Sequence, residues 1–188
     1  MTVRLQALQP TQLDEFKSLL GSSDFGGCFC AVWSAHGPDW GARCADPAAP
    51  NFAHTAGRVR GGLHAGYLAY VDERLVGWTG TGPKTSFPLL ESKLASRISP
   101  FVGQTWSIGC IAVAAEFRGR RLSDEIIAAV LDLARKAGAG RIEAYPVRPF
   151  DEPRIYRGTE ELYRRHGFVE EALEPDGDFQ VLLMSRVP

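Results

Sequence analysis

The chain of 188 residues is long enough for one domain with a hydrophobic core and barely long enough for two small ones. Hydrophobic residues make up 45%, charged residues 23%, and the formal net charge is -1, so no strong attraction to nucleic acid or to an anionic membrane is indicated. No apolar run approaches the roughly 18 residues of a membrane span, and the first residues lack the apolar stretch of a signal peptide, so we expect a cytoplasmic protein that binds neither nucleic acid nor membranes.

The first fifty residues predict a strand, a helix and a long irregular segment. Residues 3–8 have the composition of a short strand, which Pro10 ends. Thr11 is a suitable N-cap for a helix whose apolar side chains recur at helical spacing as far as Gly21. Residues 22–50 show no period, yet they carry several aromatic side chains. A long irregular segment of this kind usually serves a function, so we expect it to form the wall of a binding site.

The middle of the chain predicts alternating helices and strands. In chain order we expect a helix over residues 52–63 capped by Asn51, a β-hairpin of residues 66–71 and 75–79, a short helix over residues 88–97 and a strand over residues 105–113. The hairpin is indicated by two β-rich runs on either side of a short polar turn.

The clearest helix covers residues 122–137, where apolar residues form one stripe that Gly138 ends. After it we expect a strand over residues 141–147, a helix over residues 159–166 closed by Gly167, and an antiparallel pair of residues 168–169 and 179–184 around a turn at residues 175–177. The sequence has no repeat, low-complexity run or domain boundary. Residues 1–188 therefore predict a single α/β domain with a mixed sheet.

Four cysteines, Cys28, Cys30, Cys44 and Cys110, are too few and too unevenly spaced for a disulfide framework, and we expect them to be reduced. Together with His36, the first three also suggest a zinc site. The gap of one residue between Cys28 and Cys30 is unlike the usual spacing of zinc ligands. We therefore favour buried or pocket-lining thiols and expect no metal.

Residues 111–123 have the pattern of an anion-binding turn. A buried strand ends at Val113, a four-residue loop follows, and a basic turn containing Gly119 opens the long helix. The first amides of a helix have no partner inside it, and the helix dipole favours an anion there. Arg118, Arg120 and Arg121 add positive charge, so the turn could hold a pyrophosphate. A plain turn with solvated arginines is the alternative that local physics leaves open.

Two motifs resemble those of the GNAT acetyltransferases. Arg118, Arg121 and Ser123 take the places of that family's Gln/Arg-x-x-Gly-x-Gly/Ala motif. Residues 162–168, Leu-Tyr-Arg-Arg-His-Gly-Phe, are similar to its Leu-Tyr-x-x-x-Gly-Phe motif, and residues 142–147 lie where its fifth strand belongs. The resemblance implies an α/β (α+β) fold with a central, mixed, mostly antiparallel twisted sheet flanked by helices. It also implies an acetyl-CoA-dependent N-acetyltransferase without a metal.

The resemblance also implies which residues bind acetyl-CoA. The pantetheine arm would pair with Ile111, Ala112 and Val113, and the pyrophosphate would lie on the loop made of Arg118, Gly119, Arg120, Arg121, Leu122 and Ser123, with Tyr156 as a weaker contact. The chain departs from the family motif at two positions. Arg121 stands where the motif has a glycine, and Ser123 stands where it has a glycine or alanine. Asp124 and Glu125, just inside the helix, would repel a phosphate.

The implied chemistry is direct attack of a primary amine on the thioester, which needs a base, an oxyanion donor and an acid. Tyr163 matches the family tyrosine that protonates the coenzyme A sulfur. Glu143 is a candidate base, and His64, His36 and Cys110 are others. Relay of the proton through water would need no single strong base.

The aromatic segment around residues 28–40, with Trp78 and Phe87, is expected to line the acceptor side and to suit a small molecule or a peptide end. The resemblance leaves a homodimer open. Two rival functions remain at this point: a degenerate acyl-CoA-binding sensor of the same fold, and a zinc-stapled binding module.

Overall fold

The structure is a computed structural model that describes residues 2–92, 104–150, 156–176 and 178–188. The strands are β1 (Arg4–Ala7), β2 (Tyr67–Val71), β3 (Arg74–Pro83), β4 (Thr105–Val113), β5 (Arg141–Ala144), β6 (Val147–Arg148), β7 (Val169–Asp176) and β8 (Phe179–Arg186). The α-helices are α1 (Leu13–Leu20), α2 (Val32–Ala35), α3 (Trp40–Ala45), α4 (Pro50–Arg60), α5 (Pro88–Ser92), α7 (Leu122–Lys136) and α8 (Glu160–Arg165). Short 3-10 turns are η1 (Pro10–Gln12), η2 (Ser23–Phe25), η3 (Lys84–Ser86) and η4 (Ala115–Phe117).

The strands form one mixed sheet in the order β1-β2-β3-β4-β5-β8-β6, and β7 also pairs with β8. The β4–β5 pair is parallel, whereas the other strand pairs are antiparallel. This arrangement confirms the mixed sheet that the residues predict and the mostly antiparallel order that the resemblance implies. Among the described strands the one parallel pair follows from chain order, because α7 carries the chain back from the end of β4 to the start of β5.

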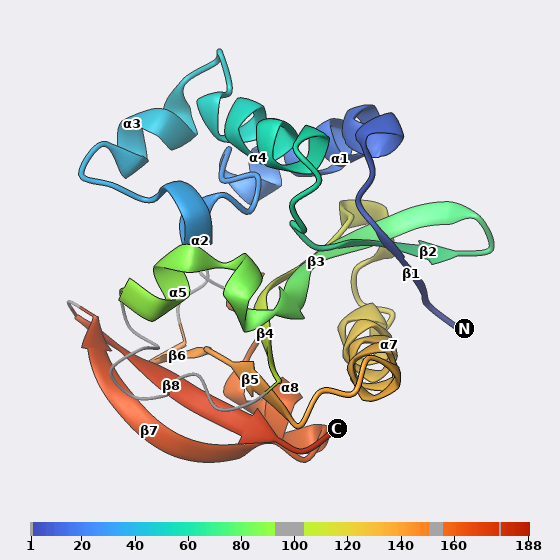
Figure 1. Cartoon of the computed structure of the whole chain (residues 1–188), viewed down its shortest axis with the longest axis vertical. Coiled ribbons are helices and arrows are strands. Elements are labelled where there is room, and N and C mark those ends of the chain that lie inside the picture. The colour runs from blue at the N-terminus through green and yellow to red at the C-terminus, as the bar shows by residue number, and fades with distance from the viewer. Residues whose placement is uncertain (1, 93–103, 151–155, 177) are drawn as a thin grey trace.

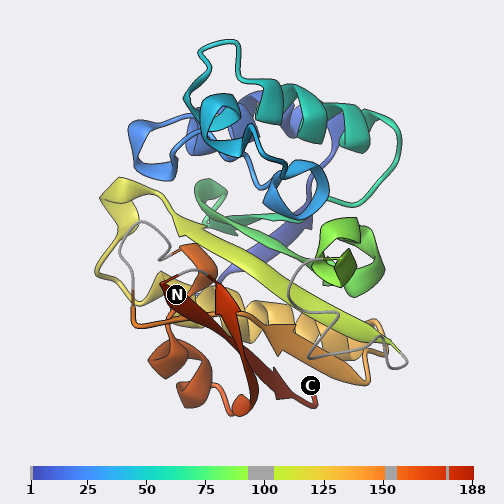
Figure 2. The same cartoon turned by 90° about the vertical axis from the view of Figure 1, so that its left-hand side faces the viewer.

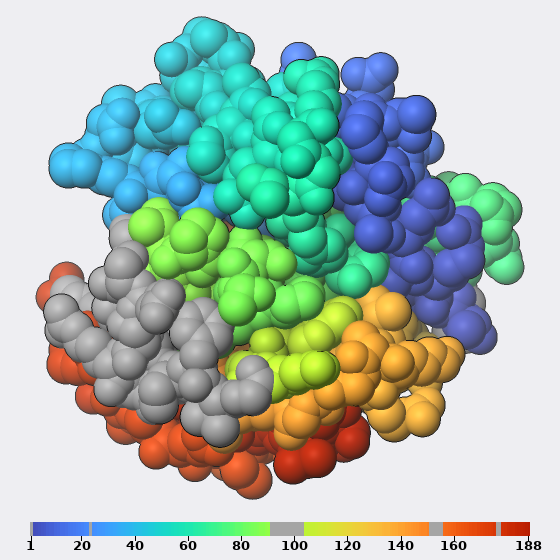
Figure 3. All heavy atoms as spheres, viewed as in Figure 1, coloured from blue at the N-terminus to red at the C-terminus, as the bar shows by residue number. Residues whose placement is uncertain are grey.

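Helices cover both faces of the sheet (Figure 1). On one face the apolar stripe of α7, with Ile126 and Val130 fully buried, packs against β3, β4 and β5 together with α8. On the other face α1 and α4 pack over β2, β3 and β4 around Phe16 and Trp78. In the space-filling view these N-terminal helices form a continuous layer above α5 (Figure 3).

The parallel strands β4 and β5 pair only over a short stretch. Residues 105–108 of β4 lie beside residues 141–144 of β5, and Gly109–Val113 continue with β3 as their only partner among the described strands. Figure 2 shows β4 running past the end of β5 toward the loop before α7. Gly109 is an extra residue in the β3–β4 register, since Gly80 lies opposite Cys110 and Thr81 opposite Ile108. The result is an open backbone edge at the end of β4.

The helix starts differ from two of the predictions. Thr11 lies inside the η1 turn and Gln12 is the N-cap of α1. Helix α4 begins at Pro50, whose ring suits the first helical position, after an N-cap at Ala49. Asn51 is instead buried inside the helix and donates to the Gly27 carbonyl oxygen at 3.1 Å, so its side chain holds a distant loop.

Two further expectations need correction in detail. The predicted strand over residues 141–147 is divided into β5 and β6, because Pro146 lacks an N–H and its carbonyl accepts from Leu182 at 2.9 Å. The irregular segment 22–50 contains the short helices α2 and α3. The hairpin, the strand at 105–113, the long helix and the helix predicted over residues 159–166 are confirmed, the last as α8 with Thr159 as its N-cap. Residues 93–97 of the predicted short helix lie outside the described residues.

Among the described residues, no helix combines the length and apolar character needed to cross a membrane. The same part of the chain holds no group of three or more His, Cys, Asp or Glu side chains arranged to bind a metal ion.

Candidate cofactor and catalytic site

The turn before α7 leaves a row of backbone amides available. Gly119 and Arg121 both adopt left-handed backbone conformations, with φ of 74° and 58°. Arg121 is the N-cap, and its carbonyl accepts from the amides of Asp124 and Glu125. Within the described chain, the amides of residues 119–123 donate no backbone hydrogen bond. An anion at this position could therefore accept several N–H groups at once.

A pocket of about 290 Å³ lies over this turn. Its lining comprises Ile111, Val113, Phe117, Arg118, Gly119, Arg121, Leu122, Ser123, Asp124, Gly158, Thr159, Leu162 and Arg165. The structure thus brings the open end of β4, the basic turn and the start of α8 to one cavity. Most of the predicted cofactor residues line it, and the exceptions are Ala112, Arg120 and Tyr156.

Those three residues lie elsewhere. Ala112 is buried on the α1 side of the sheet, and Tyr156 packs against the same cluster. The guanidinium of Arg120 lies 5.6 Å from the ring centroid of Phe117, so it covers an aromatic face beside the turn. A role for any of them toward a cofactor stays a prediction.

Arg165 is a pocket residue that sequence reasoning did not select. Its guanidinium lies 3.2 Å from the Asp124 carboxylate, which His166 also contacts at 3.2 Å. Asp124 is therefore opposed by basic side chains from the end of α8, which reduces the repulsion of a phosphate that the sequence led us to expect. The basic residues at positions 165 and 166 were visible in the sequence, but the direction in which their side chains point was not.

Arg118 connects the turn to the N-terminal segment. Its Nε donates to the Val113 carbonyl at 3.1 Å, and its guanidinium lies 3.0 Å from the Asp24 carboxylate and over the Phe25 ring. Three contacts hold one flexible side chain against the end of β4. The arginine therefore closes one side of the pocket while remaining about half exposed.

Tyr163 lies behind the pocket rather than on its wall. The side chain is fully buried against Phe168, and its hydroxyl donates to the Arg157 carbonyl at 2.8 Å. Burial raises the pKa of this phenol far above its ordinary value, with Cys110 nearby as a smaller cause. The hydroxyl is thus protonated and already has an acceptor in the free protein.

Glu143 occupies the centre of a buried polar cluster. Its carboxylate lies 2.8 Å from Lys84 Nζ and 2.7 Å from Arg141 Nε, and it accepts from the Tyr145 hydroxyl at 2.9 Å. The Tyr145 hydroxyl is also 3.0 Å from Ser107 Oγ. Two adjacent cations favour the ionised carboxylate and weaken it as a proton acceptor. The role of base stays a prediction for Glu143, and these contacts weigh against it.

The other base candidates are dispersed. His64 Nε2 lies 2.7 Å from the Thr81 carbonyl oxygen, so that nitrogen carries the hydrogen and Nδ1 is the basic one. Burial lowers the pKa of His64, which keeps it neutral at pH 7. His36 stacks on Trp40 at 5.1 Å, and Cys110 contacts Cys30.

Trp33 is the aromatic residue that reaches the open end of β4. Its indole N–H donates to the Gly109 carbonyl at 3.4 Å, and its ring lies 6.2 Å from Tyr145 and under the Arg157 guanidinium. Trp78 and Phe87, which were expected on the acceptor side, are both buried in apolar clusters. Trp33 is also buried, in the same cluster as Phe87, so it contacts β4 from within the core and its place on the acceptor side stays a prediction.

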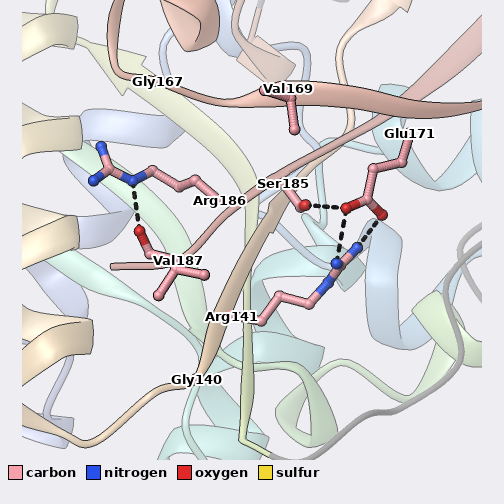
Figure 4. Close-up of a pocket in the computed structure, with 8 residues that line it drawn as sticks. All are labelled: Gly140, Arg141, Gly167, Val169, Glu171, Ser185, Arg186 and Val187. Atoms are coloured by element: carbon pink, nitrogen blue, oxygen red, sulfur yellow. Dashed lines mark hydrogen bonds and ion pairs between the residues drawn. The ribbon is translucent and has the colours of Figure 1, made fainter.

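A second cavity, of about 470 Å³, lies over the C-terminal strands (Figure 4). Gly140, Gly167, Val169 and Val187 line it together with a polar group in which Arg141 and Ser185 both donate to the Glu171 carboxylate. These polar groups satisfy one another, and the cavity does not touch the β4 edge or the basic turn. The first pocket is therefore the better candidate site.

The positions of Cys28, Cys30 and Cys44 give no support to the alternative of a zinc site. Cys30 faces Cys110, and Cys44 receives a hydrogen bond from Asn51. Burial raises the pKa of Cys28 to about 12, which disfavours the thiolate that zinc requires.

Comparison with known proteins gives one family and one fold. The family model described as the acetyltransferase (GNAT) family matches residues 29–168. Among solved structures, a protein from Desulfovibrio desulfuricans described as a GNAT acetyltransferase shares 17% identity at a TM-score of 0.60, covering 99% of this chain and 98% of that chain.

A ribosomal-protein-alanine N-acetyltransferase from Brucella melitensis shares 16% identity at a TM-score of 0.57, with both chains fully covered. The aminoglycoside acetyltransferase AAC(6')-Ib, solved with ribostamycin and coenzyme A, shares 14% identity at a TM-score of 0.66, covering 100% of this chain and 94% of that chain. No curated protein matches the sequence. At these identities the structures show a common fold.

Proposed function

Because the chain belongs to the acetyltransferase (GNAT) family, we propose that it transfers the acetyl group of acetyl-CoA to a primary amine of a small molecule or peptide. The observation that carries the proposal is that the open edge of β4 runs directly into the turn with available backbone amides. Beyond Ile108 one edge of β4 pairs with no described strand, although side chains bond to its Gly109 and Val113 carbonyls. This edge leads through a short loop into the turn whose amides 119–123 donate no backbone hydrogen bond within the described chain. The edge suits an extended amide-containing arm and the turn suits a diphosphate.

The proposed cofactor site follows the pocket. The β4 edge at Ile111, Ala112 and Val113 would pair with the pantetheine arm. The amides of Gly119 to Ser123 would hold the diphosphate, with Arg118, Arg121 and Arg165 supplying charge. Acetyl-CoA itself would supply the acetyl group as an activated thioester. Coenzyme A or acetyl-CoA is bound in several structures of the same fold, which supports this choice.

We propose Tyr163 as the acid for the leaving thiolate. To act, its hydroxyl must exchange the Arg157 carbonyl for the sulfur, and its raised pKa must fall in the complex. Polarisation of the thioester carbonyl would come from amides on the open part of β4. The amine proton would leave through water or through a neutral histidine such as His64, because Glu143 is held by two cations.

The proposal is tested by binding and by turnover. Titration calorimetry should give saturable binding of acetyl-CoA and of coenzyme A. Release of free thiol should then rise above the hydrolysis background with at least one member of an amine panel that includes an aminoglycoside, a polyamine and a peptide with a free N-terminus. If acetyl-CoA binds but none of the amines causes release of free thiol, the result would favour the acyl-CoA sensor. Absence of binding would remove both functions.

A further inference from the structure

Two cysteines far apart in the sequence meet beside the proposed acetyl site. Cys30 lies in the loop between η2 and α2, and Cys110 lies on β4, eighty positions later. Their Sγ atoms are 3.0 Å apart, about 1 Å longer than a covalent disulfide bond of about 2.05 Å. Both are free thiols in the structure, and we call them the thiol pair. A shift of this size is within the reach of a side-chain rotation.

The backbone before α2 is held in an unusual conformation that aims Cys30 at β4. Phe29 and Cys30 have φ of 43° and 54°, in the left-handed region that non-glycine residues rarely occupy. The carbonyl of Phe29 accepts a hydrogen bond from Thr55 Oγ1 at 2.9 Å, and the Phe29 ring is buried against Phe16 and Phe52. Packing thus sustains a conformation that costs free energy on its own.

Strand β3 leaves space for the thiol pair. Gly80 lies opposite Cys110, and a Cβ atom at position 80 would lie 2.3 Å from Cys30 Sγ and 3.1 Å from Cys110 Sγ. No side chain fits there while both sulfurs keep their places. The two sulfurs therefore occupy a space that the sheet provides only through a glycine.

From this geometry we infer that Cys30 and Cys110 are a redox modification site, which forms a reversible intramolecular disulfide with a small peroxide. Cys30 is half-buried as a residue and lies in a loop, whereas Cys110 is buried on the central strand β4. The Cys30 sulfur itself is enclosed against Cys110, and we assign it as the first to react because a loop opens more readily than a central strand. Cys28 lies within electrostatic reach of Cys30 and Cys44, but among the described residues only Cys30 and Cys110 have their sulfurs within hydrogen-bond distance of each other.

The chemistry balances with hydrogen peroxide as the oxidant. The Cys30 thiolate attacks one peroxide oxygen, the O–O bond breaks, and Cys30 becomes a sulfenic acid as hydroxide leaves. The Cys110 sulfur then attacks the Cys30 sulfur, the S–O bond breaks, and water leaves with the Cys110 proton. In total two thiols and one peroxide give one disulfide and two waters. The hydrogen bond with Cys110, and then burial, raise the pKa of Cys30, so the first step is slow at neutral pH.

The bond would fasten the segment around residues 28–40, which we expect on the acceptor side and call the acceptor wall, to the proposed cofactor strand. Trp33 follows Cys30 by three residues and donates to the carbonyl of Gly109, the neighbour of Cys110. Oxidation would therefore restrain the wall at the position where the strand edge opens. Formation of the bond does not depend on acetyl transfer, so its failure leaves the proposed function untouched.

Peptide mapping of the native protein tests the inference. The folded chain is treated with hydrogen peroxide, remaining thiols are alkylated, and tryptic peptides are analysed without reduction. We expect peptide 18–43 joined to peptide 98–118, with a mass two hydrogen atoms below their sum, and separation of the two after dithiothreitol. Because Cys28 shares the first peptide, the same link must persist in Cys28→Ser and disappear in Cys30→Ser. Cys44→Ser is the matched control and should retain it.

Thermal unfolding gives a second readout. Oxidised wild-type protein should unfold on the order of 5–10 °C above the reduced form, because the bond closes a long loop, and Cys30→Ser should show no such shift. Three outcomes would each overturn the inference. They are a link from Cys28 to Cys44 or to Cys110, peroxide conversion of Cys30 to sulfinic acid, and four free thiols after treatment of the folded chain. A Cys110→Ser variant is not needed, because peptide mapping of the wild-type protein identifies both linked cysteines even if that variant does not fold.

Discussion

The guanidinium of Arg118 lies 3.0 Å from the carboxylate of Asp24, which joins the basic turn before α7 to a residue 94 positions earlier in the chain. Both side chains are more than one-third exposed, so the pair itself contributes little to stability. Its importance is local. The carboxylate offsets part of the positive charge that the proposed diphosphate would meet.

The first prediction concerns this offset. Asp24→Asn should increase the affinity for coenzyme A about two- to five-fold at low salt, because Arg118 loses a competing anion. Calorimetry at two salt concentrations would show the gain and its reduction by screening. Asp132→Asn is the matched control, since Asp132 is also an exposed, ion-paired aspartate but lies on α7 outside the pocket. Weaker binding by Asp24→Asn would mean that Arg118 needs Asp24 for its position.

The second prediction concerns Arg165 and Asp124. Arg165→Gln should weaken binding of coenzyme A about ten-fold, because the pocket loses a cation and Asp124 keeps only His166 beside it. Adding Asp124→Asn should recover a large part of this loss. Equal affinities of the single and double variants would show that Asp124 does not act on the bound anion.

The third prediction separates chemistry from binding at Tyr163. Tyr163→Phe should lower turnover about 100-fold while acetyl-CoA affinity stays within about two-fold, because the hydroxyl is needed only when thiolate leaves. Loss of its bond to the Arg157 carbonyl should also cost about 1 kcal/mol of stability. Tyr70→Phe is the control, since it removes a partly buried tyrosine hydrogen bond, to Glu15, on strand β2 away from the pocket. Unchanged turnover in Tyr163→Phe would remove this tyrosine from the reaction.

The sequence predicted the elements that bury one apolar face, as α7 does, or nearly every side chain, as β4 does. The helix at residues 122–137 and the strand at residues 105–113 are confirmed because one face, or both, must pack into the core. The two predicted N-caps failed for a different reason. A cap is a local preference, and Asn51 satisfies a distant carbonyl instead, while Pro50 and a 3-10 turn set the actual starts.

For the candidate cofactor site, the sequence predicted the turn and the strand edge but not which side chains contact them. Motif spacing located the loop at residues 118–123, because the loop conformation is local. The partners Asp24, Arg165 and Cys30 come from remote segments, and a single sequence carries no information about which side chains meet across the fold. The same limit explains Glu143, whose position on β5 was expected but whose two cationic partners were not.

A fourth prediction tests the buried pair of Lys84 and Glu143. Both side chains are almost completely buried, so Lys84→Met should leave a carboxylate with only part of its compensation and cost about 3 kcal/mol of unfolding free energy. The double variant Lys84→Met with Glu143→Met should recover more than half of that cost. Lys136→Met, which breaks an exposed pair on α7, should cost less than about 0.5 kcal/mol in the same urea titration. A small effect of Lys84→Met would mean that Glu143 becomes protonated or hydrated at little cost.

The fifth prediction concerns acid stability and Glu171. The hydrogen bond from Arg141 is the largest cause that lowers the pKa of Glu171 below its ordinary 4.5. Burial opposes it by raising the pKa, and the hydrogen bond from Ser185 lowers it further. A carboxyl group with a lowered folded-state pKa stabilises the protein above its unfolded pKa, and that contribution disappears as pH falls through the folded pKa. Glu171→Gln should therefore cost about 0.5–1 kcal/mol at pH 7, a modest value because the side chain is one-third exposed. The difference from wild type should shrink steadily as pH falls below about 4.5. Urea unfolding from pH 7 to pH 3 measures it, and a difference that does not change with pH would show that Glu171 acts through packing and not through its charge.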